Sequence, residues 1–182
     1  KQTIELQPYF SEFALIKNRV KVEYDYFLAL CKSNIGGLGE VLPINPELEQ
    51  ALEKFDESEA EKIKEIEKTT NHDVKAVEYY LRDVFNHYGI GNSKEYIHFG
   101  LTSQDINNTA FPLMLKEATQ NVMLPNLDEL LNLLLKSRFT KQTFKSLEPI
   151  SEFIFSKYGN STIQGLHHVA QKVTATILSL FD

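Results

Sequence analysis

The sequence has little of what several common classes of protein require. It contains one cysteine, Cys31, so it cannot form an internal disulfide, and a reducing compartment is expected. Cys31 falls on an apolar helical face, where packing is a better explanation than catalysis. No run approaches the roughly 20 apolar residues of a membrane-spanning helix, and no charged-then-apolar leader opens the printed sequence. We therefore expect a cytoplasmic protein that does not enter a membrane.

Positive charge is also scarce, because 19 lysines and arginines face 25 aspartates and glutamates, for a formal net charge of -6. A nucleic-acid-binding surface is normally basic, so no nucleic-acid partner is expected. The sequence has no glycine-rich phosphate loop, no cysteine pair and no His-Glu-x-x-His string. Its five histidines are spaced too irregularly to indicate a zinc site, so no metal is expected.

What the sequence does contain is helical periodicity. With 182 residues, 42% of them hydrophobic, it can bury a substantial core. The most informative run is TTNHDVKAVEYY at residues 69–80, where polar residues stand directly before a helical pattern. That pattern consists of Val74, Val77, Leu81 and Val84. The polar residues are therefore expected at a helix start, whose free N–H groups and partial positive charge suit a carboxylate or phosphate.

Two interpretations of this helix start remain open. In the first, His72 is held at the helix N-terminus, where a histidine tends to stay neutral, and takes part in binding or proton transfer. In the second, Thr70 or Asn71 caps the helix and His72 faces solvent. Capping is the usual reason for such residues at this position, so the residues alone do not decide between the two.

A second polar cluster, HFGLTSQDINNTA at residues 98–110, opens another predicted helix. Thr102 and Ser103 begin this helix, and Asp105 stands in its first turn. The spacing Thr102-x-x-Asp105 is that of a capping box with aspartate in place of glutamate, so capping alone could account for these residues. Hydroxyl groups at a helix N-terminus also suit a substrate carboxylate.

Together the two runs closely resemble motifs of the adenylosuccinate lyase family, within the fumarase and aspartase superfamily. The first resembles the family motif TTNHDVKAVEY and the second resembles HF-x-x-TS-[EQ]-DIN. The match extends from about residue 6 to about residue 135. It implies an all-α fold, with an N-terminal helical domain at 1–100, the start of a central helical bundle at 101–135 and a helical tail of unassigned relationship at 136–182. Argininosuccinate lyase is the nearest competitor, but the string at 71–79 points away from it.

The resemblance implies a C–N lyase that eliminates fumarate from adenylosuccinate to give AMP, without a metal or organic cofactor. The implied substrate-binding residues are Asn71, His72, Asp73, His98, Thr102 and Ser103. By resemblance, His72 orients the substrate or assists proton transfer, and Asp73 can fix the histidine tautomer or the loop. Thr102 and Ser103 hold the succinyl or fumarate part, and His98 lies near the phosphate-binding region. Family members are homotetramers with shared sites, so a homo-oligomer is expected.

The sequence also departs from the family. It lacks strings resembling S-P-[IV]-D-G-R-Y, which helps to hold the phosphate, S-R-T-H-G-Q-P-A, which carries the general acid, and S-S-x-M-P-x-K-x-N-P, which carries a catalytic serine. His167 and His168 are weak replacements for the acid, since adjacent helical residues point about 100° apart. The alternatives are therefore a non-catalytic helical binding or assembly module derived from the lyase, a portion of a longer polypeptide, or a junction near Lys136.

Overall fold

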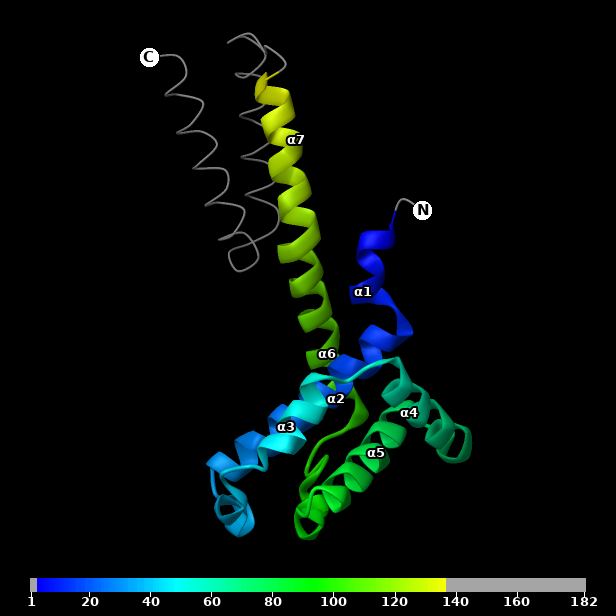
Figure 1. The fold of residues 1–182 in the computed structure, drawn as a ribbon, viewed down its shortest axis with the longest axis vertical. Coiled ribbons are helices and arrows are strands. Elements are labelled where there is room, and N and C mark those ends of the chain that lie inside the picture. Colours follow the sequence, from blue (N-terminus) through cyan, green and yellow to red (C-terminus); the bar gives the residue numbers. More distant parts are fainter. Residues whose placement is uncertain (1–2, 137–182) are drawn as a thin grey trace. The chain divides into compact units, whose positions relative to one another are not determined.

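The computed structural model describes residues 3–136, and every regular element in this range is helical, which confirms the all-α prediction (Figure 1). The elements are η1 (Ile4–Leu6), α1 (Gln7–Phe10), α2 (Glu12–Lys32), η2 (Ile35–Val41), α3 (Pro46–Glu53), α4 (Glu57–Thr70), α5 (Asp73–His87), η3 (Gly91–Tyr96), α6 (Ser103–Ala118), the π-helical η4 (Thr119–Met123) and α7 (Leu124–Lys136). The predicted tail helices, with His167 and His168, lie outside the described residues. None of the described helices is long and apolar enough to cross a membrane.

The chain divides into two compact units, Lys1–Ala118 and Thr119–Asp182. The first unit contains all six residues that the sequence nominates for substrate binding. Of the second unit, the structure describes η4 and α7. The predicted domain boundaries at residues 100 and 135 concern the architecture of a whole enzyme and stay a prediction.

The main core of the first unit is built on α2, which buries Val20, Phe27 and Cys31 along one side. The ring of Phe27 meets that of Phe85 from α5 edge to face, with centroids 4.7 Å apart, and neither side chain is exposed. Cys31 is only 1% exposed, and burial raises the pKa of its thiol, so its predicted packing role is confirmed. This core fixes α5 against α2.

A smaller core joins the parts of the fold that carry the two sequence motifs. It consists of Val22 from α2, Val74 from the first turn of α5, and Ile106 and Ala110 from α6. Val74 and Ile106 are almost completely buried, at 1% and 0% exposure. Because each lies within a few residues of a helix start, their packing on α2 brings the first turns of α5 and α6 together.

Candidate functional site

The corner between α4 and α5 is made by Asn71, whose φ of 49° places it in the left-handed region. Its backbone N–H donates to the carbonyl of Glu67 at 2.8 Å, which closes the last turn of α4. Asparagine tolerates this conformation better than most residues. Asn71 therefore ends α4, and the prediction that Thr70 or Asn71 caps the following helix is wrong.

His72 itself is the N-cap of α5. Its Nδ1 accepts a hydrogen bond from the backbone N–H of Lys75 at 3.2 Å, so in the neutral ring the proton is on Nε2. That Nε2 lies 3.4 Å from Oγ of Ser103 at the start of α6, although the two residues are 31 positions apart. His72 therefore caps α5, and its role in binding or proton transfer stays a prediction. Oδ1 of Asp73 lies 3.6 Å from the same Nδ1 that accepts the Lys75 N–H.

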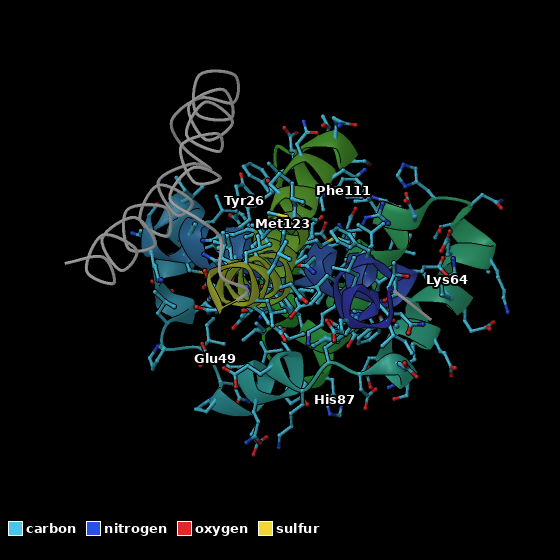
Figure 2. All side chains as sticks on the ribbon, turned by 90° about the horizontal axis from the view of Figure 1, so that it is seen from above. Tyr26, Glu49, Lys64, His87, Phe111 and Met123 are labelled. Carbon is cyan, nitrogen blue, oxygen red and sulfur yellow. The ribbon has the colours of Figure 1, made fainter. Side chains whose placement is uncertain are left out.

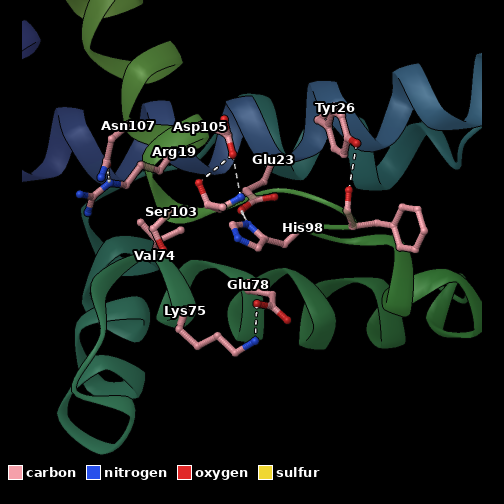
Figure 3. A network of polar contacts seen from close by, with 12 residues as sticks. Arg19, Glu23, Tyr26, Val74, Lys75, Glu78, His98, Ser103, Asp105 and Asn107 are labelled. Carbon is pink, nitrogen blue, oxygen red and sulfur yellow. Dashed lines mark hydrogen bonds and ion pairs between the residues drawn. The ribbon is translucent and has the colours of Figure 1, made fainter.

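Asp73 connects the start of α5 to a buried arginine of α2. Its Oδ1 accepts from the backbone N–H of Val74 at 2.8 Å, and its Oδ2 lies 2.7 Å from Nη2 of Arg19. Arg19 is only 6% exposed, and its Nε donates to Oδ1 of Asn107 on α6 at 3.0 Å, as Figure 3 shows. One guanidinium therefore contacts the N-terminal parts of both motif helices, α5 and α6.

The start of α6 has the predicted reach-back contact. The backbone N–H and the hydroxyl of Thr102 both donate to Oδ2 of Asp105, at 2.8 and 2.7 Å, which confirms the capping interpretation of this pair. Within residues 3–136, the N–H groups of Ser103 and Gln104 in the next positions donate to no other group. These two donors remain available to an anion at the helix N-terminus.

His98 precedes α6 and is held against α2. Its Nδ1 lies 2.5 Å from Oε1 of Glu23, and its backbone has a φ of 61°. The next residue is held too, because the hydroxyl of Tyr26 donates to the carbonyl of Phe99 at 2.9 Å. Figure 3 shows His98 between α2 and α5. Arg19, Val22, Glu23 and Tyr26 thus form one face of α2, at three- and four-residue spacing, that anchors the second motif.

The two aspartates of the site are kept ionised. Partial burial acts to raise the pKa of Asp73, but the Val74 N–H and the Arg19 guanidinium outweigh it and hold that pKa below its usual value. The backbone N–H and then the hydroxyl of Thr102 lower the pKa of Asp105. Neither carboxylate is therefore tuned for proton transfer near neutral pH, which leaves the histidines as the proton-transfer candidates among the predicted residues.

Acid should weaken the fold through Asp73. The group has a lower pKa in the folded state than its ordinary 3.8, so its contribution to stability is complete above that value. The contribution of Asp73 to stability is lost as the pH falls through the lower pKa that this group has in the folded state. We expect the free energy of unfolding, measured with urea from pH 6 downward, to fall less steeply in Asp73→Asn than in the wild type. An identical slope would contradict this ion pair.

Two residues of this network, Arg19 and Glu23, were not nominated from the sequence, and Asn107 was given no role although it ends the resembled string DIN. The partners of these residues lie 54 to 88 positions away in the sequence. Lys75 Nζ lies 2.6 Å from the carboxylate of Glu78, which is 3% exposed, so these two residues form an ion pair. No group of three or more candidate metal ligands occurs in the part of the chain that the structure describes.

The sequence model of the lyase family matches residues 6–143, so the chain belongs to this family. Individual curated relatives have a more specific name than the family model does. The chain is 48% identical over 135 residues to an adenylosuccinate lyase of Dictyostelium discoideum, a stretch covering 68% of this chain and 28% of the relative. The resemblance inferred from the two motifs is therefore confirmed.

Bacterial adenylosuccinate lyases give similar matches. The enzyme of Legionella pneumophila strain Corby is 45% identical over 139 residues, which cover 71% of this chain and 29% of the relative. That of Vibrio cholerae is 43% identical over 140 residues, which cover 74% and 30%. The chain thus spans less than a third of the length of these relatives.

Proposed function

We propose that this chain supplies the substrate-carboxylate-binding part of an adenylosuccinate lyase, which releases fumarate from adenylosuccinate and leaves AMP in purine biosynthesis. One observation carries the proposal: His72 Nε2 lies 3.4 Å from Ser103 Oγ, so the N-termini of α5 and α6 meet at a single point. Helix N-termini present N–H groups and partial positive charge, and two of them side by side suit a dicarboxylate better than one.

The elimination sets clear demands on such a site. A base removes a proton from the carbon next to a carboxylate, the electrons of that C–H bond form the double bond of fumarate, and the C–N bond breaks. An acid then protonates the departing nitrogen. Negative charge grows on the carboxylate, where prepositioned donors stabilise it. The Ser103 hydroxyl, the N–H groups of Ser103 and Gln104, and the Nε2–H of His72 can supply those donors.

The tautomer of His72 limits the way in which this residue can take part in proton transfer. Because Nδ1 accepts the Lys75 N–H, the outward Nε2 carries a proton and can donate it or hydrogen-bond a substrate oxygen. A protonated Nε2 has no free lone pair in the ring plane, so it cannot act as a base. We therefore assign His72 to substrate orientation or protonation, and Asn71, Asp73, His98 and Thr102 to supporting positions around the same substrate.

The rest of the reaction belongs to segments that this sequence does not contain. The general acid and the catalytic serine lie in family motifs absent from residues 1–182. We propose that they come from other parts of a cytoplasmic homotetramer. Support for oligomerisation comes from α7, where large apolar side chains are exposed within the described range. These are Leu127, Leu130 and Leu133, at 37%, 51% and 56% exposure.

Ligand binding to the purified chain tests the proposal. Adenylosuccinate and argininosuccinate are titrated separately in a calorimeter, and fumarate release is followed by absorbance. We expect adenylosuccinate to bind and argininosuccinate to bind at least about tenfold more weakly. Binding without release of fumarate is the expected result for this chain alone, because the acid and serine motifs are absent from residues 1–182. No binding of adenylosuccinate, or equal binding of both compounds, would contradict the proposal.

A further inference from the structure

The chain contains a buried acidic group that the proposed reaction leaves unexplained. Glu23 of α2 has an exposed fraction of 0%, and its Oε1 lies 2.5 Å from Nδ1 of His98. Its other oxygen, Oε2, has no hydrogen-bond partner among residues 3–136. A buried carboxylate with a free oxygen is costly, so some gain must offset that cost.

The backbone on the other side of this contact is unusual as well. His98 has a φ of 61°, and the left-handed region is uncommon for residues other than glycine. The hydroxyl of Tyr26, one helical turn after Glu23, binds the carbonyl of Phe99 and holds the loop in this conformation. The fold therefore uses an unfavourable backbone and a buried acid to place one imidazole ring, which is 17% exposed.

The charges around Glu23 decide how the pair holds its protons. Burial raises the pKa of Glu23 despite the opposing effect of His98, and the charge of Glu78 on α5 raises it further. Glu78 is itself paired with Lys75 and with Arg82. On the α6 side, Asp105 interacts electrostatically with the imidazole of His98. On α2, Arg19 is one turn before Glu23 and is engaged with Asp73.

We propose that Glu23 is a positioning residue that holds His98 by its Nδ1 and shares one proton with it, so that Nε2 keeps its hydrogen and donates to an anionic group of the ligand. A proton between Oε1 and Nδ1 makes the buried pair neutral overall, which avoids a bare carboxylate beside Glu78. If the pair lost one proton, the single hydrogen left on the ring would sit on Nδ1 and donate to the Glu23 carboxylate, and Nε2 would become an acceptor. The ligand part of this inference rests on the proposed function.

The first experiment does not depend on any ligand. The chain is labelled with ¹⁵N-histidine, and long-range ¹H–¹⁵N spectra at pH 7 report which ring nitrogens of His98 carry hydrogen. We expect hydrogen on Nε2 and a strongly deshielded shared proton at Nδ1 in the wild type. A ring protonated at Nδ1 alone would overturn the proposal. This test needs no variant, so it stands even if Glu23→Gln fails to fold.

Variants then separate the shared proton from packing. Glu23→Gln keeps the size of the side chain and one hydrogen bond but cannot share an acidic proton, so we expect the deshielded signal to vanish. Glu59→Gln is the matched control. Glu59 is on α4, and in the wild type its carboxylate accepts a hydrogen bond from the hydroxyl of Tyr80 at 2.8 Å. This substitution should leave the His98 spectrum unchanged. A deshielded signal that survives in Glu23→Gln would contradict the assignment.

A ligand measurement connects the pair to the site. AMP and adenosine are titrated into both variants and the wild type, because the two ligands differ only by the phosphate. We expect Glu23→Gln to weaken AMP binding about tenfold, which is the size of one charge-assisted hydrogen bond, and to leave adenosine unaffected. If the substitution weakened the binding of AMP and adenosine equally, Glu23 would have only a structural role. If the wild type bound no AMP, the proposed function would fail while the spectra still tested the pair.

Discussion

Replacement of His72 by alanine is expected to lower kcat/KM for adenylosuccinate by about 100-fold or more, measured together with the parts of the enzyme that supply the acid and the serine. The substitution removes the Nε2–H that meets Ser103 at the junction of α5 and α6. It also removes the N-cap of α5, because Nδ1 accepts the Lys75 N–H, and loss of a cap costs about 1 kcal/mol of stability. Fumarate release and adenylosuccinate affinity should both be measured, since either can carry the loss.

Two matched variants distinguish chemistry from capping. Asparagine is a good N-cap but is too short to reach Ser103, so His72→Asn should keep the stability of the wild type and lose function nearly as fully as alanine. His87 lies at the other end of the same helix and points outward in Figure 2. His87→Ala should therefore behave like the wild type. Full activity in His72→Asn would show that His72 is only a cap.

Replacement of Arg19 by methionine is expected to lower the free energy of unfolding by about 2 kcal/mol and to weaken adenylosuccinate binding about tenfold. Methionine keeps the aliphatic stem but leaves Asp73 and Asn107 without their shared partner. Breaking a buried ion pair costs more than this, but the Asp73 side chain is 47% exposed and can be hydrated. The affinity falls because the starts of α5 and α6 are no longer held together.

Lys64 provides the control for that variant. Its Nζ makes two ion pairs, with Glu12 and Glu67, each at 2.7 Å. They are on the surface, and Figure 2 shows Lys64 at the periphery of the molecule. Surface pairs contribute under about 1 kcal/mol, so Lys64→Met should cost less than Arg19→Met and leave binding unchanged. Equal losses of stability and affinity in Arg19→Met and Lys64→Met would show that Arg19 does not hold the starts of α5 and α6 together.

The sequence predicted the helices of the site because their pattern is local. Val74, Val77 and Leu81 follow helical spacing and are all buried in α5. The pairing of Thr102 with Asp105 was also visible, since a capping box lies within four residues. What the sequence could not give was the choice of cap for α5, because Asn71 was needed to end α4 and a histidine is not a usual cap.

The long-range contacts were beyond prediction for a different reason. Arg19 and Glu23 are charged residues in a long, largely apolar helix, and nothing near them in sequence marks them as buried. Their partners, Asn107 and His98, are 88 and 75 positions away. The three- and four-residue spacing from Arg19 through Glu23 to Tyr26 was the available signal, because it places these polar residues on one helical face.

The substrate site is tested most directly by an NMR titration of the ¹⁵N-labelled chain with adenylosuccinate. We expect the backbone amide signals of Ser103 and Gln104 and the ring signals of His72 to shift together, at one common ligand concentration. Such a result would place the ligand where α5 and α6 begin. Binding that leaves these three signals unchanged, and shifts amide signals elsewhere in the chain, would show that the two helix starts do not form one site.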